Sequence, residues 1–329
     1  MKTSRLVAAL LAALLLTALT PAFAQYSFSP INYPDSGNTT SALGINNAGT
    51  VTGNYLDPGT GLGTGFVYAN GAYTSVAVPS ALSTSLGAIN GAGLALGTYE
   101  AVGNTTHSFT YDGSNITFLP DYPGTGVTET AAYGINNTGR IVGVTSSDAS
   151  FMPFSGFELV AGVYTSYVYP GSVSTGLLGI NDSGAIVGNY FDAQGGSFGF
   201  LLPSGLASTP VEVNFPGAAG TWPLSINNFG DIAGFYEDSN SIGHGFVYRG
   251  GSFTTVDYPD DPGLSPVVPG ETGTFLWQIN DQGQIAGTYN NYSNGFVASV
   301  VPEPSSYALV LLGAGAVYAW GRRKGLNRS

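Results

Sequence analysis

Tyrosines and acidic residues recur side by side along this chain of 329 residues. Tyrosine can stack on the face of a sugar ring, and carboxylates can accept hydrogen bonds from sugar hydroxyls or coordinate calcium. We predict that these residues share one face of the molecule and bind a ligand there, and we name this set the acidic rim. The acidic rim comprises Tyr55, Asp57, Tyr99, Glu100, Asp148, Tyr190, Asp192, Tyr236, Glu237, Asp238, Asp260, Asp261 and Tyr289.

The acidic rim leaves three functions open. In the first, which we adopt, the protein binds extracellular polysaccharide without reacting with it, and calcium is the one candidate cofactor. In the second, two of the carboxylates cleave a glycoside, which requires a separation of about 5 to 10 Å. In the third, the tyrosines pack between structural units, the acids solvate loops, and the protein fills a matrix without a defined ligand.

Six copies of an Ile-Asn motif divide the chain into similar units. They begin at Ile45, Ile89, Ile135, Ile180, Ile226 and Ile279. A glycine follows each motif four and again eight residues after the isoleucine, and a phenylalanine begins a strand-like segment about twenty residues on. Alternating apolar residues and Asn-Gly turns make each unit of about 45 residues read as four short strands, the spacing of a propeller blade. The repeated Asn-Asn-x-Gly segments are predicted to be turns rather than a site.

The two ends of the repeat region predict how the ring closes. The sixth unit stops after its third strand, which contains Phe296, while residues 26–33 carry the tyrosine-proline ending of a fourth strand. Because open strand edges invite association, we expect residues 26–33 to pair with the strand of Phe296. The predicted fold is all-β: a six-bladed β-propeller over residues 25–301. In such blades, the loops from second to third strands and the loops between blades emerge on one face, so the acidic rim should be one-sided.

Two histidines, His107 and His244, occupy equivalent positions in the second and fifth units. These units lie opposite each other on a six-fold ring, so we expect no shared acid–base site. The chain contains no cysteine, which excludes thiol chemistry and cysteine-based metal sites. We therefore assign no catalytic residue.

Both ends of the chain look like targeting segments. Residues 1–24 combine a basic start, an apolar run and a small-residue cleavage site, which predicts a signal peptide cut by signal peptidase between Ala24 and Gln25. At the other end, Pro302, Glu303 and Pro304 precede an apolar run over residues 307–320 and a cluster of basic residues. The run is short for a bilayer, and we predict a helix that enters the inner membrane transiently and packs little against the propeller.

The order of Pro-Glu-Pro, apolar run and basic end over residues 302–329 resembles the PEP-CTERM sorting signal. The resemblance implies processing by exosortase in the inner membrane of a Gram-negative bacterium, export to the surface or extracellular matrix, and an association with exopolysaccharide and biofilm. The repeats resemble the HAF repeats of extracellular bacterial proteins, through Gly-Ile-Asn-Asn-x-Gly and through His-x-Phe at His107 and His244. Four units have other residues at the histidine position. That resemblance implies a propeller-like fold and no settled activity.

The charge of the region between the two targeting segments limits the classes of partner that it can bind. Residues 25–301 contain two basic residues, Arg140 and Arg249, and nineteen acidic ones, which gives a net charge of −17. Such a region repels nucleic acid and anionic lipid and attracts cations or basic partners. We therefore exclude nucleic-acid binding.

Overall fold

The computed structural model describes residues 25–34, 36, 39–147, 153–259, 273–290 and 292–301. These residues form 24 strands and no helix, and so they include no helical segment suited to crossing a membrane. The predicted signal peptide and the predicted C-terminal helix lie outside the described residues.

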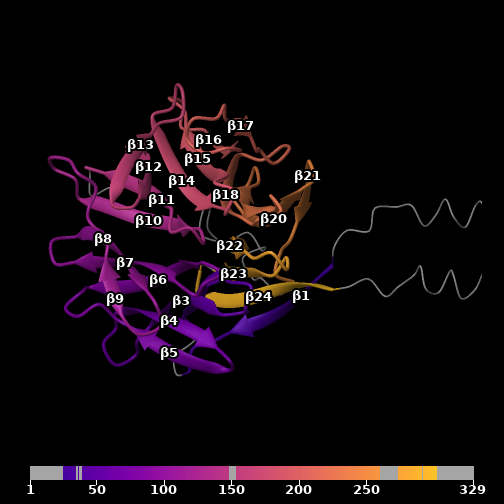
Figure 1. Ribbon diagram of the computed structural model, residues 1–329. Helices are drawn as coiled ribbons and strands as arrows, with labels where there is room; N and C mark the ends of the chain where they lie inside the picture. The colour runs from indigo at the N-terminus through magenta and orange to yellow at the C-terminus, as the bar shows by residue number, and fades with distance from the viewer. Residues whose placement is uncertain are drawn as a thin grey trace, which may run out of the picture. The chain divides into compact units, whose positions relative to one another are not determined.

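The strands form six four-stranded antiparallel blades arranged around an axis (Figure 1). The first three blades are β2 (Thr40–Ile45), β3 (Val51–Leu56), β4 (Gly63–Ala69) and β5 (Ala72–Val76); β6 (Ser83–Ile89), β7 (Ala95–Ala101), β8 (Thr105–Tyr111) and β9 (Ile116–Phe118); and β10 (Glu129–Ile135), β11 (Ile141–Ser146), β12 (Phe154–Val160) and β13 (Val163–Tyr167). The last three are β14 (Ser174–Ile180), β15 (Ile186–Phe191), β16 (Ser197–Leu202) and β17 (Val211–Glu212); β18 (Gly220–Ile226), β19 (Ile232–Glu237), β20 (Gly243–Arg249) and β21 (Ser252–Thr255); and β22 (Phe275–Ile279), β23 (Ile285–Tyr289), β24 (Asn294–Val301) and β1 (Gln25–Ile31).

The sixth blade confirms the predicted closure. Its outermost strand is β1, which pairs with β24, the strand of Phe296. The ring of Phe28 meets the ring of Phe296 edge-on at 5.3 Å between centroids, and Ser27 Oγ donates a hydrogen bond to the backbone oxygen of Ser299. The first and last strands of the propeller are thus held in one sheet, and β24 is not left as an open edge.

The repeated phenylalanine and the second repeated glycine form the core of each blade. The phenylalanines are Phe66, Phe109, Phe157, Phe200, Phe246 and Phe296, and none has any exposed surface. In the first blade, a Cβ on Gly53 would lie 1.8 Å from the backbone oxygen of Ser41 and 2.9 Å from the Phe66 ring. The glycine is required because the aromatic ring of the third strand and the backbone of the first strand both reach the second strand at this point.

Each inter-blade loop is fastened by a threonine at or next to the start of the first strand of the next blade. In the first blade, Thr40 Oγ1 accepts a hydrogen bond from the backbone N–H of Tyr33, the residue of the tyrosine-proline ending. The same bond recurs around the ring at 2.8 to 3.1 Å. The threonines are Thr40, Thr84, Thr130, Thr175, Thr221 and Thr274.

The Asn-Asn-x-Gly segments are turns, as predicted. Asn46 Oδ1 accepts bonds from the backbone N–H groups of Ala48 and Thr50, and Gly49 has a φ of 76°. The same asparagine has a second role that was not predicted, because its Nδ2 donates to the backbone oxygen of the corresponding asparagine in the next blade. These bonds run around the axis at 2.9 to 3.4 Å and return to their start. We name them the asparagine ring: Asn46, Asn90, Asn136, Asn181, Asn227 and Asn280.

Candidate functional site: an axial cavity and the acidic rim

The first strand of every blade contains an irregularity that turns extra side chains toward the axis. In the first blade, β2 and β3 pair regularly until the register shifts between Ala42 and Gly44, which leaves Leu43 unpaired. Such a bulge opposes two residues of one strand to a single residue of its neighbour. The same shift occurs in all six first strands. The bulged residues are Leu43, Ala88 with Gly87, Tyr133, Leu178, Leu224 and Trp277.

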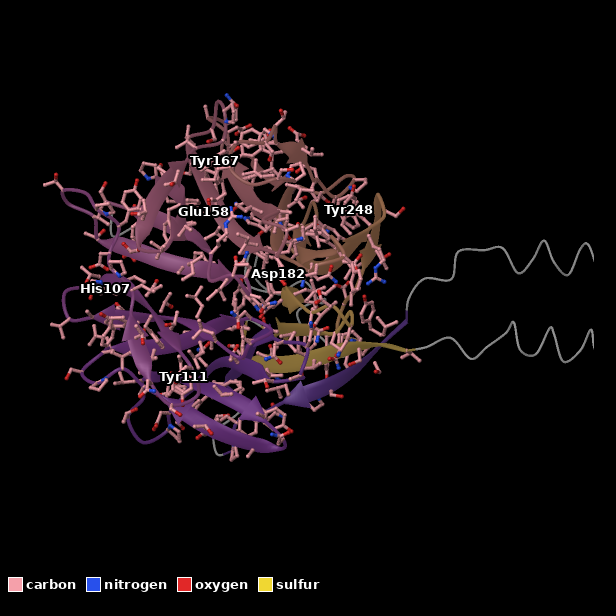
Figure 2. All side chains as sticks on the ribbon, viewed as in Figure 1. His107, Tyr111, Glu158, Tyr167, Asp182 and Tyr248 are labelled. Atoms are coloured by element: carbon pink, nitrogen blue, oxygen red, sulfur yellow. The ribbon has the colours of Figure 1, made fainter. Side chains whose placement is uncertain are left out.

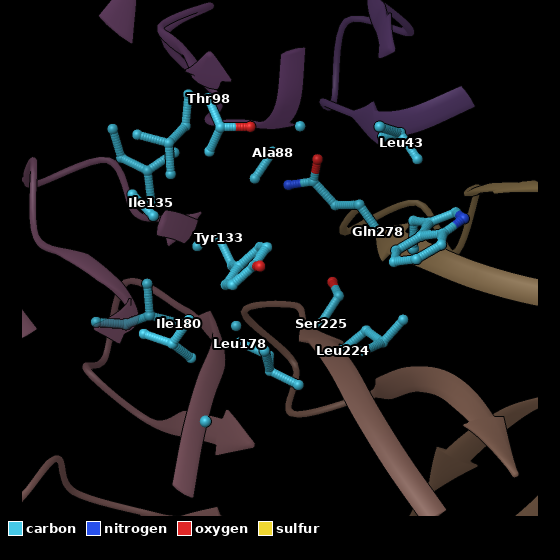
Figure 3. Close-up of a pocket in the computed structure, with 18 of the residues that line it drawn as sticks. Leu43, Ala88, Thr98, Tyr133, Ile135, Leu178, Ile180, Leu224, Ser225 and Gln278 are labelled. Atoms are coloured by element: carbon cyan, nitrogen blue, oxygen red, sulfur yellow. The ribbon is translucent and has the colours of Figure 1, made fainter. Parts of the chain in front are cut away.

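These bulged residues line a cavity of about 520 Å³, which we name the axial cavity. Aromatic residues outside the bulges complete it, namely Phe154, Phe191 and Trp222. Figure 3 shows Tyr133 among the lining side chains, with Leu178 and Leu224 nearby. None of the described lining residues carries a charged side chain. The cavity therefore offers apolar contact, and its lining contains no carboxylate or imidazole for acid–base chemistry.

Small residues after the bulges let the inner strands approach each other. A Cβ on Gly44 would lie 2.2 Å from the backbone oxygen of Gly87 in the next blade, and one on Gly179 would lie 2.8 Å from the backbone oxygen of Leu224. Five of the six blades have Gly, Ala or Ser directly before the Ile-Asn motif. In most blades an apolar residue and then a small one precede the Ile-Asn motif, and this pattern is the sequence signal from which the axial cavity could have been predicted.

The sixth blade has Gln278 in place of a small residue before the Ile-Asn motif. The Gln278 side chain forms hydrogen bonds with the first and second blades at one end of the axial cavity. Its Oε1 accepts bonds from the backbone N–H groups of Ile45 at 2.9 Å and Ile89 at 3.1 Å, and its Nε2 donates to Ile89 O. The repeated isoleucines lie at this level, with the asparagine ring beyond them. Past the isoleucines lies a polar recess of about 60 Å³ lined by the asparagine ring. The asparagine end of the axial cavity is thus filled by isoleucine and Gln278 side chains.

Tyr133 supplies a hydroxyl to the axial cavity. Two fifths of its side chain is accessible, and it lies on an innermost strand where that surface faces the cavity rather than the outside of the ring. Burial within the ring raises the pKa of Tyr133 to about 12, and the nearby carboxylate of Glu129 adds to the rise. The hydroxyl therefore stays neutral and remains a hydrogen-bond donor at physiological pH.

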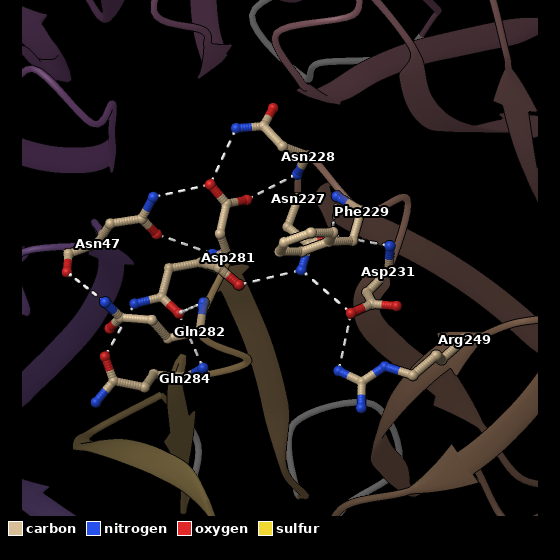
Figure 4. Close-up of polar contacts among 10 residues, drawn as sticks. Asn47, Asn227, Asn228, Phe229, Asp231, Arg249, Asp281, Gln282 and Gln284 are labelled. Atoms are coloured by element: carbon tan, nitrogen blue, oxygen red, sulfur yellow. Dashed lines mark hydrogen bonds and ion pairs between the residues drawn. The ribbon is translucent and has the colours of Figure 1, made fainter.

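A second polar network lies beside the asparagine ring, on the face of the propeller where the Asn-Asn-x-Gly turns emerge (Figure 4). Asp281 accepts bonds from Asn47 Nδ2 at 2.8 Å and from both the backbone and side chain of Asn228. Asp182 accepts bonds in the same way from Asn137 and Asn228. These two carboxylates bind the amides of neighbouring blades, and they place negative charge on a face predicted to carry mainly uncharged turns.

The tyrosines of the acidic rim are stacked inside the blades. Tyr55 lies against Tyr33 of the preceding loop, with centroids 3.6 Å apart and planes 4° from parallel. Tyr190, Tyr236 and Tyr289 stack in the same way on Tyr169, Phe215 and Tyr258. The second face of Tyr190 meets Phe198, and that of Tyr236 meets His244. Tyr99 differs because the inter-blade loop before its blade has Val78 where the other loops have an aromatic residue. Its ring stacks on His107 instead. Rings covered in this way serve packing, and sugar stacking by these tyrosines stays a prediction.

The acids of the rim that the structure describes lie on one end of the blades, opposite the Asn-Asn-x-Gly turns. Asp57, Asp192 and Asp238 each bind backbone N–H groups of their own loop. The bond from Ile242 N–H is the main cause of a lowered pKa at Asp238. Burial, together with the charge of Asp238, raises the pKa of Glu237. Glu100 pairs with Ser83 at the end of β7.

Three acids of the rim, Asp148, Asp260 and Asp261, lie outside the described residues, as do Pro302, Glu303 and Pro304. Within the described ranges, no group of three or more histidine, aspartate or glutamate side chains is arranged to hold a metal ion. A ligand-binding role for the acidic rim, with or without calcium, therefore stays a prediction.

The two histidines have separate partners. His107 on β8 bonds to Asp121 at 2.7 Å, and His244 on β20 bonds to Asp257 at 2.9 Å. The strands β8 and β20 belong to the second and fifth blades and lie on opposite sides of the ring in Figure 1. In Figure 2, His107 lies at the periphery, whereas Asp182 lies near the middle of the ring. The histidines therefore form no common site.

The sequence contains one Gly-x-Ser-x-Gly segment, at residues 195–199, so an expectation that this nucleophile motif is absent is wrong, but its serine has a structural position. Ser197 stands between Gly195 and Gly199 at the start of β16, is 6 % exposed, and accepts a hydrogen bond from Asn189 Nδ2. The nucleophile of an α/β-hydrolase instead lies exposed on a turn between a strand and a helix. This segment is part of a blade and carries no hydrolase site.

Solved structures of other proteins share this fold. TolB from Acinetobacter baumannii superposes with a TM-score of 0.53 at 11 % identity, over 76 % of this chain and 63 % of that one. The β-propeller domain of the trilobed protease from Pyrococcus furiosus superposes with a TM-score of 0.50 at 8 % identity, over 82 % and 85 %. A lectin from Aleuria aurantia described as a six-bladed β-propeller has a TM-score of 0.48 at 14 % identity, over 82 % and 98 %. At these identities, the likenesses concern the fold alone, and the likeness to the protease domain supports a β-propeller.

No curated protein matches the sequence. The resemblance of the repeats to HAF repeats stays a prediction. The PEP-CTERM protein-sorting motif matches residues 300–324, which include the Pro-Glu-Pro segment and the apolar run. The chain is therefore an exported protein that carries a PEP-CTERM motif for exosortase sorting in a Gram-negative bacterium.

Proposed function

We propose that this protein is a non-enzymatic binding module of the bacterial surface or extracellular matrix. The observation that carries the proposal is the axial cavity, a recess of about 520 Å³ at the centre of the ring. Its size is that of a ligand pocket, about 300 to 1,000 Å³. Because its described lining contains no carboxylate, imidazole or amine, it offers surface for binding and no acid–base pair for catalysis.

The same proposal includes an association of the acidic face with exopolysaccharide in a biofilm. Both cations of the propeller are already paired, Arg140 with Glu158 at 2.8 Å and Arg249 with Asp231 at 2.8 Å. The carboxylates of the acidic rim are therefore left without an arginine or lysine to balance them, which favours divalent cations as bridges to an anionic polysaccharide. Signal peptidase and exosortase would process the two ends, with the C-terminal segment entering the inner membrane only in passage.

The experiment is a retention assay of the full chain on immobilised bacterial exopolysaccharides, in buffer with calcium and in buffer with a chelator. We expect retention in calcium and release by the chelator. Release of reducing sugar ends during the assay would instead support glycoside cleavage. Passage through every column in both buffers would count against the exopolysaccharide association and favour an acidic rim that only solvates its loops.

A further inference from the structure

The axial cavity is a built feature of the fold and not a gap between blades. All six first strands carry a bulge at the same position, and every bulged residue lines the cavity. The residues on either side of each bulge pack between blades, as Ala42 and Ile45 do in the first blade. Among the bulged residues, Ala88 also packs against a blade core, whereas the other side chains belong to the cavity lining and to none of the blade cores.

The polar groups that line the axial cavity are largely engaged by the protein itself. Gln278 binds the backbone of Ile45 and Ile89 at both ends of its amide. Ser225 Oγ accepts the N–H of Ile279, and Asn189 Nδ2 donates to Ser197. A sugar that entered this cavity would lose its hydrogen bonds with water and find few replacements, at about 1 to 3 kcal/mol for each unsatisfied group. The lining therefore selects against carbohydrate.

The aromatic walls of the axial cavity are held in fixed orientations. Trp277 Nε1 donates to Thr288 Oγ1 at 2.8 Å, and the ring of Trp222 stacks on Phe235 at 4.7 Å between centroids. Rigid walls lower the entropy that must be lost when a ligand binds. An apolar cavity of about 150 Å³ already accepts benzene, so a volume of about 520 Å³ admits a molecule of several rings.

We propose that the axial cavity binds a small, uncharged, predominantly aromatic or hydrocarbon molecule with few hydrogen-bonding groups. This inference rests on the proposed function only in that the chain binds rather than reacts, and it concerns a site and a ligand class separate from polysaccharide at the acidic rim. The hydroxyl of Tyr133 is the lining group that can bond a single polar atom of such a ligand. The apolar side chains supply the remaining contact.

Two dyes with one skeleton test the ligand class on the full chain. N-phenyl-1-naphthylamine is uncharged, whereas 1-anilinonaphthalene-8-sulfonate carries a sulfonate on the same rings. We expect the uncharged dye to bind with a rise in its emission, and the sulfonate to bind at least about tenfold more weakly, because the lining offers it no cation. We also expect energy transfer from tryptophan, since Trp222 and Trp277 line the cavity.

Variants that fill the axial cavity test the location. Leu178→Trp places an indole at a bulge position, and the sixth blade already carries Trp277 at the equivalent position. Gly87→Leu adds bulk from the second blade, at the position two residues before the repeated isoleucine where three other blades carry leucine, and a Cβ there would meet only Leu96 O, at 3.8 Å. Each variant should weaken binding of the uncharged dye at least about tenfold. Leu56→Trp is the matched control on a residue 45 % exposed, and it should leave the affinity unchanged.

The outcomes separate this inference from the proposed function. No binding of the uncharged dye by the unaltered protein, equal binding of the sulfonate, or undiminished binding by both folded filling variants would each overturn the axial-cavity site. Circular dichroism melting curves establish that the variants fold, and either filling variant alone suffices for the test. Retention on polysaccharide is measured apart from dye binding, so its failure would remove the exopolysaccharide association and leave the axial-cavity site standing.

Discussion

Asn280 Nδ2 donates a hydrogen bond of 2.9 Å to the backbone oxygen of Asn46, which lies 234 residues earlier in the chain. This bond completes the asparagine ring, so the sixth blade is tied to the first at the axis as well as through β1 at the periphery. All six bonds run in the same direction around the axis. Each asparagine also accepts backbone bonds of its own turn, so one side chain serves both the turn and the contact between blades.

Asn136→Ala should therefore lower stability more than a surface substitution does. Asn136 is 3 % exposed, donates to Asn181 O and accepts from the N–H groups of Thr138 and Arg140. Leaving those buried groups unbonded costs about 1 to 3 kcal/mol each. At about 2 to 4 °C per kcal/mol for a domain of this size, we expect a loss of at least about 5 °C in Tm by differential scanning calorimetry. Asn115→Ala, on an exposed hairpin, is the control, and an equal loss there would contradict the role of the asparagine ring.

The threonine that fastens each inter-blade loop is tested at Thr84, which is 3 % exposed and accepts the N–H of Val78 at 3.0 Å. Thr84→Val keeps the shape and removes the acceptor, so the free energy of unfolding should fall by about 1 to 3 kcal/mol. Thr84→Ser keeps the hydroxyl and should retain most of the stability. Urea unfolding curves measure both variants, and a serine variant as unstable as the valine variant would show that the methyl group, not the hydrogen bond, matters.

Tyr190→Ala should destabilise the fourth blade, because its ring is stacked between Tyr169 and Phe198. Because the ring is half-buried, its removal should cost less than the ~3 to 5 kcal/mol of a fully buried aromatic ring. Tyr190→Phe keeps the stack and loses only the 3.3 Å bond to Glu212, so its unfolding free energy should stay within about 1 kcal/mol. Guanidinium unfolding monitored by circular dichroism compares the two. A stable alanine variant would mean that the ring is available for a ligand after all.

Stability should depend on pH through Glu129, which is 3 % exposed and has one carboxylate oxygen without a partner among the described residues. Burial raises the pKa of Glu129 in the folded protein. The folded state therefore favours the protonated carboxyl, and this contribution is present below the unfolded pKa and lost as pH rises through the folded one. Relative to Glu129→Gln, the unaltered protein should lose stability as the pH rises from the ordinary glutamate pKa of about 4.3 into the neutral range. Urea midpoints across this range measure it, with the exposed Glu212→Gln as control, and a constant difference would refute the assignment.

Calcium should raise Tm if the acidic rim binds cations. Asp57 and Asp192 also cap their own loops through backbone N–H bonds, so alanine at either position would disturb the loop itself. Asp57→Asn and Asp192→Asn keep an oxygen for these bonds and remove the charge. We expect these variants to keep the Tm of the unaltered protein without calcium and to show a smaller rise in millimolar calcium. A melting curve of the unaltered protein that does not respond to calcium would leave the rim as solvated surface.

The propeller could be read from the sequence because its repeats are regular. The six Ile-Asn motifs give the blades, and the tyrosine-proline ending of residues 26–33 gives the strand that completes the sixth blade. The threonine that fastens each inter-blade loop could be found in the sequence as well, since a threonine stands five residues before each of the six isoleucines. It was missed because its partner is a backbone N–H group, which leaves no mark of its own in the sequence.

The site was harder to predict because the same residue types serve packing and binding. Tyr55 next to Asp57 is the pattern of a sugar site, yet its ring face is covered by Tyr33 from a loop more than twenty residues earlier. That partner belongs to the preceding unit, so the contact cannot be read within one repeat. The axial cavity depends on bulges, and a bulge changes which side chains face the axis without changing the residues present.

The six blades share the same residue types at the positions that pack the blades, and they differ in residue type at the bulged position. The buried phenylalanine and the threonine that fastens the inter-blade loop are the same in all six blades, whereas the bulged position, two residues before the repeated isoleucine, holds leucine, glycine, tyrosine or tryptophan. A substitution there changes the cavity and leaves the contacts between blades in place. Gene variants of this one scaffold can therefore reshape the axial cavity one blade at a time while the propeller fold is kept.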